Sequence, residues 1–310
     1  MPTARGTVLD AGRPPEVEAG PLPAGAPAAI GAYRLLGLIG SGGFGTVYLA
    51  RRQGSATVVA LKTLHAGTAH DEELNRRFAN EARVLAQAPA AHTARVLDTG
   101  VADGVPFIAM ELLDGRPLQA LLRERGTLGD PAALRALAVA LALALDALHA
   151  RRLVHRDLKP SNIMMTSDGP KLLDFGISLM VDHTRLTRTG GMVGTPVFMA
   201  PEQLAEGPVG PAADVWAWAC CLVGAAHGDS PFATANPYAV YHRIVHEEPD
   251  PAGLAAVRAL DPALAEVVEL ALAKDLAVRP ADGAALLALL TAAGGPADHQ
   301  VARGWDALVG

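Results

Sequence analysis

Three side chains at short spacings are suited to moving a phosphoryl group. Asp157 is followed five residues later by Asn162, in the run His-Arg-Asp-Leu-Lys-Pro-Ser-Asn over residues 155–162. Asp174 comes twelve residues further on and opens an Asp-Phe-Gly triplet. A carboxylate can accept the proton of an attacking hydroxyl, and carboxylate and amide oxygens are ligands that suit Mg2+. We therefore expect a base and magnesium ligands among these three residues. Taken alone, Asp157 and Asp174 could also be turn or cap residues.

A glycine-rich segment lies upstream of these residues. Residues 40–47 read Gly-Ser-Gly-Gly-Phe-Gly-Thr-Val, and the glycines lead into a β-branched and aromatic run. The backbone N–H groups of such a hairpin can lie over phosphates where a Cβ would clash. In dinucleotide-binding folds the same glycine spacing opens a helix, so the strand that follows argues against that reading. An ordinary flexible hairpin is the remaining alternative.

A lysine and a glutamate are expected to meet beside this hairpin. Lys62 lies in a predicted strand, residues 57–64, with Ala60 on the same face. A lysine on an apolar face needs a partner. Glu81 lies in the apolar stripe of a predicted helix over residues 71–87, so we expect Glu81 to pair with Lys62 and to place it on the phosphates. Taken alone, each residue is more often a solvated surface charge.

The elements around these residues form a strand-rich part and then a helical part. Strands are predicted over residues 33–39, 46–51, 57–64, 95–98 and 106–111, with one helix among them. Helices are predicted over residues 131–152, 212–227, 237–246, 263–274 and 282–292. The first of these helices has a clear start, because Asp130 is a good N-cap and Pro131 suits the first helical position.

Composition and net charge indicate which partners and which cellular compartment to expect. The chain has 310 residues, half of them hydrophobic, and a formal net charge of -6. That charge offers no global positive field for nucleic acid or an anionic membrane. The two cysteines, Cys220 and Cys221, are adjacent in an apolar run, which indicates buried thiols and a reducing compartment. We expect a cytoplasmic protein that does not bind nucleic acid.

No membrane-spanning or secretory segment is expected. The most hydrophobic run, residues 136–145, is shorter than the about 20 residues that a span requires, and we interpret it as a buried helix. No apolar segment typical of a signal peptide follows Met1. Residues 1–30 are rich in Pro, Ala and Gly without apolar periodicity, which predicts a disordered arm.

These motifs, in this order, resemble the eukaryotic-like serine/threonine protein kinases, especially the bacterial branch. The resemblance covers about residues 33–292. Its landmarks are residues 40–47, 60–62, 155–162, 174–176, 194–196 and 200–202, with Glu81, Asp214 and Arg279. It implies an α+β, bilobal protein-kinase fold with a small antiparallel β-sheet N-lobe that has one helix and a larger, mainly helical C-lobe. The implied division is an arm at 1–30, an N-lobe at 31–113, a C-lobe at 114–293 and a short tail at 294–310.

The resemblance also implies the binding site for ATP and Mg2+. The nucleotide would contact Ile39, Gly40, Ser41, Gly42, Gly43, Phe44, Gly45, Val47, Ala60, Lys62, Met110, Glu111, Leu113 and Met164. Within this set Met110 would be the gatekeeper, and the backbone of Glu111 and Leu113 would bind adenine. The catalytic residues would be Asp157 as the base, Lys159, Lys62 and Glu81, with Lys159 reaching the γ-phosphate. Asn162 and Asp174 would hold Mg2+. Glu202 would pair with Arg279, and His155 is expected to be a packed structural imidazole.

Autophosphorylation is expected between residues 174 and 202. Arg156 precedes the catalytic base, and a fixed cation there would gain most from a dianionic partner. Thr187 and Thr189 lie where bacterial relatives place paired phosphothreonines, so we predict phosphorylation of both; they could also be ordinary loop hydroxyls.

The predicted function is a serine/threonine protein kinase that acts on protein substrates and forms a homodimer for trans-autophosphorylation. A catalytically weak kinase-fold scaffold is the main alternative. The presence of every residue that catalysis would need argues against it; these residues are Lys62, Glu81, Asp157, Asn162 and Asp174. A small-molecule phosphotransferase is less favoured, because Thr195 and residues 200–202 form a peptide-docking segment that such enzymes usually lack.

Overall fold

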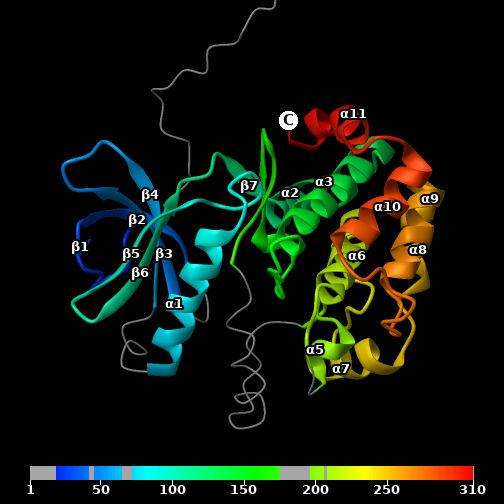
Figure 1. Ribbon diagram of the computed structural model, residues 1–310, viewed down its shortest axis with the longest axis horizontal. Coiled ribbons are helices and arrows are strands. Elements are labelled where there is room, and N and C mark those ends of the chain that lie inside the picture. The colour runs from blue at the N-terminus through cyan, green and yellow to red at the C-terminus, as the bar shows by residue number, and fades with distance from the viewer. Residues whose placement is uncertain (1–18, 42–44, 65–71, 175–195, 206–207, 310) are drawn as a thin grey trace, which may run out of the picture.

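The computed structural model describes residues 19–41, 45–64, 72–174, 196–205 and 208–309 of the chain. Their elements form a strand-rich N-lobe and a mainly helical C-lobe that lie side by side (Figure 1). The predicted α+β, bilobal architecture is confirmed.

The N-lobe is built on a six-stranded antiparallel sheet. Its strands are β1 (Ala29–Ile30), β2 (Tyr33–Ser41), β3 (Gly45–Arg52), β4 (Val58–Leu64), β5 (Val96–Ala102) and β6 (Val105–Glu111). They lie in the order β1-β2-β3-β4-β6-β5. In β4 the side chains of Val59 and Leu61 are buried in the N-lobe core. Ala60 and Lys62 therefore lie on the other face, which is half-buried.

Helix α1 (Glu72–Gln87) covers this second face of the sheet. Its Phe78 and Ala82 belong to the same buried cluster as Ile108 of β6. The register places Ile108 opposite Lys62, so the lysine lies on the sheet face that looks toward α1 and the C-lobe.

The C-lobe consists of helices around a central apolar helix. The helices are α2 (Leu118–Arg125), α3 (Pro131–His149), α5 (Pro201–Leu204), α6 (Ala212–His227), α7 (Pro237–His246), α8 (Pro251–Leu260), α9 (Pro262–Ala271), α10 (Gly283–Gly294) and α11 (Ala297–Val309). Helix α3 begins as predicted, because Asp130 accepts a hydrogen bond from the Ala132 N–H at 2.8 Å. The thiols of Cys220 and Cys221 are buried in α6 as predicted, and burial raises the pKa of both.

By length and composition alone, α3 could cross a membrane, although we expected its apolar run to be too short. However, 67% of its most apolar window is buried inside the fold, where α6, α10 and α11 pack around it. The apolar sequence of α3 is therefore explained by its position as the core helix of the C-lobe, as predicted.

A second, short sheet lies where the two lobes meet. Its strands are β7 (Gly115–Pro117), β8 (Ile163–Thr166) and β9 (Gly169–Leu172). From β9, the Leu172 N–H donates to His92 O of the N-lobe at 2.8 Å. Residues 150–162 connect α3 to β8 and end in the short 3-10 helix η2 (Pro160–Asn162). The predicted base thus lies in a loop beside the junction of the lobes.

The predicted disordered arm is wrong for residues 19–30. Ile30 is buried in the N-lobe core, and Gly20 exchanges two backbone hydrogen bonds with Leu38 of β2. Backbone pairing at a sheet edge needs no apolar periodicity, which is why a sequence rich in Pro, Ala and Gly did not reveal it. Residues 1–18 lie outside the described part of the chain.

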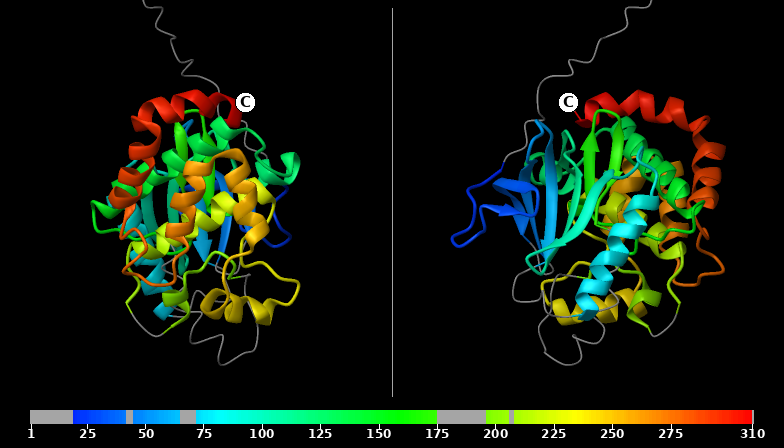
Figure 2. Two further views of the ribbon diagram at one scale, coloured as in Figure 1. Left: turned by 90° about the vertical axis from the view of Figure 1, so that its right-hand side faces the viewer. Right: turned by 60° about the vertical axis from the view of Figure 1, so that its left-hand side comes forward.

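The segment that we expected to be a short tail, residues 294–310, is largely helix α11, which lies along α3 (Figure 2). A Cβ on Gly304 would lie 2.1 Å from Ala132 O, so the two helices touch backbone to backbone there. Trp305 is buried, and its Nε1 donates to Thr166 O at 3.1 Å. Helix α11 is therefore an integral part of the C-lobe.

Candidate active site

Three strands bring the glycine-rich segment and Lys62 together. The register pairs Gly40 of β2 with Val47 of β3, and Val47 with Lys62 of β4. Residues directly opposite each other on antiparallel strands point to the same face of the sheet. Val47 and Lys62 therefore share one face, and Ala60 joins them because it lies two residues before Lys62.

Lys62 forms an ion pair with Asp174, which follows β9. Lys62 Nζ lies 2.8 Å from Asp174 Oδ1, and the lysine side chain is only 13% exposed. The Asp174 side chain is half-buried, and this partial burial works to raise its pKa, but the charge and hydrogen bond of Lys62 outweigh it and hold that pKa below its usual value. Asp174 is therefore ionised at neutral pH. The side chain of the predicted partner, Glu81, lies outside the described part of the structure, so that pairing stays a prediction.

The buried carboxylate of Asp214 holds the loop that carries Asp157. Asp214 lies in the first turn of α6 and is 1% exposed. It accepts the backbone N–H groups of His155 and Arg156, both at 2.7 Å. Arg156 has a φ of 67°, a left-handed conformation that costs a non-glycine residue about 1–2 kcal/mol. The bonds to Asp214 fix this conformation in the residue directly before Asp157.

His149, the last residue of α3, also binds Asp214. Its Nδ1 accepts the Gly283 N–H at 2.9 Å, so its Nε2 carries the hydrogen and donates to Asp214 Oδ2 at 3.0 Å. Helices α3, α6 and α10 thus converge on one carboxylate, and through it they support the loop at residues 150–162, which we name the catalytic loop after the predicted role of Asp157.

His155 ties the catalytic loop to the end of β9. Its Nε2 donates to Leu173 O at 2.9 Å, and its Nδ1 accepts the Asp157 N–H at 3.3 Å. Complete burial lowers the pKa of His155, although the nearby charges of Asp214 and Asp157 act against this. The imidazole is therefore neutral and structural, as predicted.

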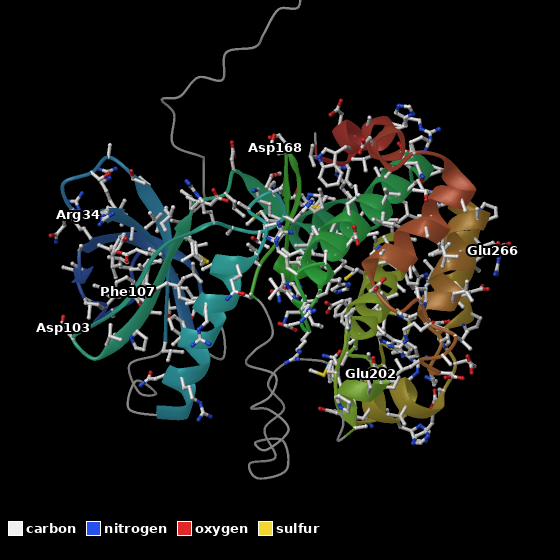
Figure 3. All side chains as sticks on the ribbon, in the orientation of Figure 1. Arg34, Asp103, Phe107, Asp168, Glu202 and Glu266 are labelled. Atoms are coloured by element: carbon white, nitrogen blue, oxygen red, sulfur yellow. The ribbon has the colours of Figure 1, made fainter. Side chains whose placement is uncertain are left out.

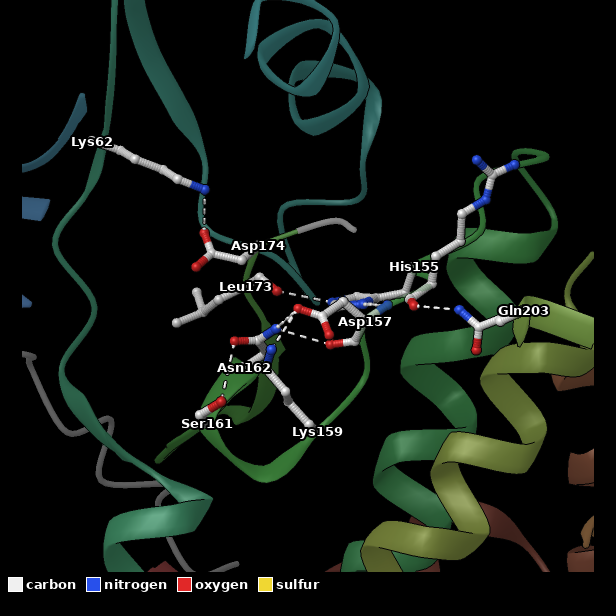
Figure 4. A network of polar contacts seen from close by, with 10 residues as sticks. Lys62, His155, Asp157, Lys159, Ser161, Asn162, Leu173, Asp174 and Gln203 are labelled. Carbon is white, nitrogen blue, oxygen red and sulfur yellow. Dashed lines mark hydrogen bonds and ion pairs between the residues drawn. The ribbon is translucent and has the colours of Figure 1, made fainter. Parts of the chain in front are cut away.

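Asp157 has one carboxylate oxygen held and the other open (Figure 4). Its Oδ2 accepts Lys159 Nζ at 2.7 Å and Asn162 Nδ2 at 2.9 Å. Asn162 Nδ2 also donates to Asp157 O at 2.8 Å. Among the described residues none bonds to Asp157 Oδ1. That oxygen can therefore accept a proton from an incoming hydroxyl.

Asn162 and Asp174 present oxygens that fit Mg2+. Because the Asn162 amide nitrogen is engaged with Asp157, its Oδ1 turns the other way, where Ser161 Oγ lies 3.4 Å from it. Asp174 accepts the hydrogen bond of Lys62 through Oδ1, and Oδ2 is the second oxygen that the same carboxylate can offer to a metal ion. Mg2+ is commonly bound by one or two such protein oxygens together with substrate phosphates. The donor set therefore suits magnesium.

The residues expected around adenine lie at the lobe junction. The register places Met110 opposite Ala60, and Met110 is 9% exposed. The Glu111 N–H donates to Arg95 O at 2.9 Å, so Glu111 can offer only its carbonyl to a ligand along this edge. Of the remaining expected contacts within the described ranges, Ser41 is exposed and the others are partly buried; these others are Ile39, Gly40, Gly45, Leu113 and Met164.

The expected peptide-docking segment is anchored in the C-lobe. Arg279 Nη1 donates to Glu202 Oε1 at 2.7 Å, which confirms the predicted pair. The Arg279 side chain is fully buried, and its guanidinium lies 5.0 Å from the ring centre of Trp216. Gln203 Nε2 donates to Arg156 O at 2.8 Å, so this segment joins the catalytic loop directly. Figure 3 marks Glu202 on α5 in the C-lobe.

Several predicted residues lie outside the described ranges, and their roles stay predictions. They are Gly42, Gly43, Phe44, Thr187, Thr189 and Thr195.

Sequence reasoning did not single out His149 or Gln203. His149 had a weak signal, a polar residue that ends a strongly apolar helix. Gln203 had no signal in the sequence, because glutamine is a common residue in helices. Their importance comes from partners that are distant in the chain, Asp214 and Arg156.

Two curated relatives are clearly similar to this chain. It is 40% identical over 229 residues to the serine/threonine-protein kinase AfsK of Streptomyces griseus, which is 74% of this chain and 28% of AfsK. It is 37% identical over 251 residues to PknD of Mycobacterium tuberculosis, which is 80% of this chain and 38% of PknD. The chain therefore spans less than half the length of these relatives.

A solved structure and a family model agree with this similarity. The kinase domain of Mycobacterium tuberculosis PknI superposes with a TM-score of 0.65 at 29% identity, covering 87% of this chain and 98% of that one. Residues 33–285 match the family model for the protein kinase domain. Since the match runs from β2 into α10, the chain belongs to the protein kinase family.

Proposed function

We propose that the chain is an ATP-dependent serine/threonine protein kinase, which transfers the γ-phosphate of ATP to Ser or Thr hydroxyls of proteins. The observation that carries the proposal is the arrangement around Asp157. One of its oxygens is held by Lys159 and Asn162, and the other is open. The Lys62–Asp174 ion pair joins the N-lobe to the end of β9, which the His155 bond ties to the same loop.

The base works through the open oxygen of Asp157. Because its bonds to Lys159 and Asn162 fix the plane of the carboxylate, Oδ1 keeps one direction. As the hydroxyl oxygen bonds to the γ-phosphorus and the bond to ADP breaks, the hydroxyl proton passes to Oδ1. Mg2+, when bound by Asn162 and Asp174, neutralises charge on the phosphate oxygens.

The nucleotide would lie under the N-lobe sheet. Val47, Ala60 and Lys62 share the face that looks toward the C-lobe, which supports adenine and phosphate contacts along that row. We assign adenine hydrogen bonds to the carbonyl of Glu111 and the N–H of Leu113. Ile39, Gly40, Ser41, Gly42, Gly43, Phe44, Gly45, Met110 and Met164 complete the proposed contacts, and Glu81 is the proposed second partner of Lys62.

The decisive experiment compares Asp157→Asn with a matched control. Radiolabelled ATP and a generic protein substrate measure transfer, and calorimetry measures ATP affinity. Asp157→Asn should lower turnover at least about 100-fold, because a general base contributes about 100- to 10,000-fold. ATP affinity should stay within about twofold, since the proposed nucleotide contacts remain. Near-wild-type turnover of Asp157→Asn would show that the base is assigned wrongly.

The control is Asp168→Asn, which removes the same charge from the exposed tip of the β8–β9 hairpin (Figure 3). Its turnover should match the wild type. A catalytically weak scaffold is the alternative, and it predicts ATP binding without transfer in the wild type and in both variants.

Serine/threonine specificity is proposed from Lys159 and Thr195, which in the family shape the site for a short aliphatic hydroxyl. Lys159 contacts Asp157, which supports a role beside the incoming hydroxyl. Phosphoamino-acid analysis should find phosphoserine and phosphothreonine. A predominance of phosphotyrosine would overturn the assignment.

Activation is proposed to follow phosphorylation of Thr187 and Thr189 in a homodimer. A dianionic phosphothreonine would suit Arg156, whose backbone is held by Asp214 and Gln203. Mass spectrometry should find phosphate at both threonines in wild-type protein and none in an Asp157→Asn preparation. Full activity of a Thr187→Ala/Thr189→Ala variant would exclude the switch.

The setting is proposed to be the cytoplasm, where the thiols of Cys220 and Cys221 would stay reduced. Cell fractionation tests this location directly.

A further inference from the structure

Residues 19–30, here named the strap, run along the outer edge of β2 (Figure 2). The C-terminal end of the strap is β1, which pairs antiparallel with the start of β2. Its other end is fastened at Gly20, whose N–H donates to Leu38 O at 2.8 Å and whose carbonyl accepts the Leu38 N–H at 2.9 Å. Two backbone bonds thus hold β2 two residues before Gly40, the first glycine of the glycine-rich segment.

The strap holds β2 beside an irregularity of that strand. The register with β3 shifts between Leu38 and Gly40, so Ile39 is an extra residue in the pairing. A bulge of this kind bends a strand and redirects its side chains. Ile39 and Gly40 are both proposed nucleotide contacts. Their direction therefore depends on how Leu38 is held.

The close approach of the strap requires glycine at position 37. A Cβ on Gly37 would lie 2.9 Å from Ala19 Cβ and 2.9 Å from Gly20 O, closer than real Cβ contacts. Because β3 pairs with β2 on its opposite side, a side chain at position 37 would displace the strap rather than β2. Leu22 adds a second attachment, since it packs with Leu38 against the N-lobe core.

From these contacts we propose that the strap is a positioning element of the ATP site. It fixes residues 38–40 of β2 so that Ile39 and Gly40 face the nucleotide. The inference rests on the nucleotide site proposed above. Loosening the strap should raise the KM for ATP and leave the KM for the protein substrate unchanged, because the proposed peptide-docking segment lies in the C-lobe.

The test uses Gly37→Ala in the full chain. The KM for ATP should rise about three- to tenfold, which corresponds to losing one or two backbone hydrogen bonds. Ala19→Gly alone should behave as wild type. Because Ala19→Gly removes one of the two clashes, it should restore part of the ATP affinity when combined with Gly37→Ala. Gly20→Pro, which deletes the N–H that Leu38 O accepts, should reproduce the Gly37→Ala effect.

Two results would overturn the proposal. One is an unchanged KM for ATP in both Gly37→Ala and Gly20→Pro. The other is a loss of kcat with no change in ATP affinity, which would indicate general damage to the fold. ATP affinity is also measured by calorimetry in the Asp157→Asn background, so the strap is tested even if the wild type transfers no phosphate to protein.

Discussion

Replacing Asp214 by asparagine should slow phosphoryl transfer much more than it weakens ATP binding. The two Asp214 oxygens accept the N–H groups of His155 and Arg156 at 2.7 Å, and one of them also accepts from His149 at 3.0 Å. An asparagine keeps one acceptor oxygen and places an amide donor where the other was. One backbone N–H therefore loses its acceptor and faces a second donor.

The size of the effect follows from these bonds. A hydrogen bond to a charged group contributes about 1.5–3 kcal/mol, and the substitution removes at least one of them. Arg156 also loses part of the support for its left-handed conformation. If that energy is lost from the loop in the transition state, kcat should fall about 10- to 150-fold. The Kd for ATP should change less than about twofold, because the bonds of Asp214 within the described part of the chain all go to C-lobe residues.

The matched control is Asp261→Asn. Asp261 is also a largely buried carboxylate, and it accepts two hydrogen bonds from Arg135 at 2.6 and 2.5 Å, away from the catalytic loop. Both variants should lower the thermal unfolding midpoint, but only Asp214→Asn should lower kcat when both are assayed well below that midpoint. Equal losses of kcat in the two variants would refute the positioning role of Asp214.

Three further predictions concern stability. Because burial holds the pKa of His155 below 6.5 in the fold, the unfolded chain binds the extra proton, so the free energy of unfolding should be highest above pH 6.5 and fall below it. Urea titrations should show a shallower pH slope for His155→Gln, and an unchanged slope would contradict this. Trp305→Ala should cost about 3–5 kcal/mol in the same titrations, and Trp305→Phe less; a negligible loss would mean that α11 is not part of the core. Arg279→Lys should cost about 3–5 kcal/mol, because lysine cannot replace all the bonds of the buried guanidinium to Glu202 and the backbone; an unchanged unfolding midpoint would contradict it.

The arrangement of Asp157 and Asn162 was predictable because its signal is local. Asp157 and Asn162 are five residues apart, and Asn162 Nδ2 bonds directly to both the carboxylate and the backbone carbonyl of Asp157. Helices with a clear start and periodicity were also found at their true positions: α6 and α7 match the predicted bounds. The alternation of β4 correctly placed Lys62 on the same face as Ala60, opposite the buried Val59 and Leu61.

Long-range contacts were beyond the same reasoning. One partner of Lys62, Asp174, is 112 positions away, and no local pattern in the sequence indicated it. The predicted pairing of Lys62 with Glu81 stays a prediction. Helix α11 packs on α3 through a close approach at Gly304. A single glycine in the sequence does not indicate which helix will contact it. Helix α8 is a different case. Its Asp250-Pro251 start is the same signal that identified α3, so it could have been found.

The two lobes fix different parts of the proposed reaction, and this leads to a last prediction. The strap and Gly37 act on β2, whereas Asp214 acts on the loop that carries Asp157. Among the described residues these two groups share no hydrogen-bond partner. Substitutions that are distant and have no common partner usually add within about 0.5 kcal/mol.

A double-variant cycle of Gly37→Ala and Asp214→Asn should therefore show the ATP effect of the first and the kcat effect of the second, with almost no coupling. Values of kcat/KM for ATP from the four proteins give the coupling energy directly. A coupling well above about 0.5 kcal/mol would show that the strap also influences the catalytic loop. The Lys62–Asp174 ion pair would be the first route to examine. Lys62 lies in β4, which pairs with β3, and Asp174 directly follows Leu173, whose carbonyl accepts the hydrogen bond of His155.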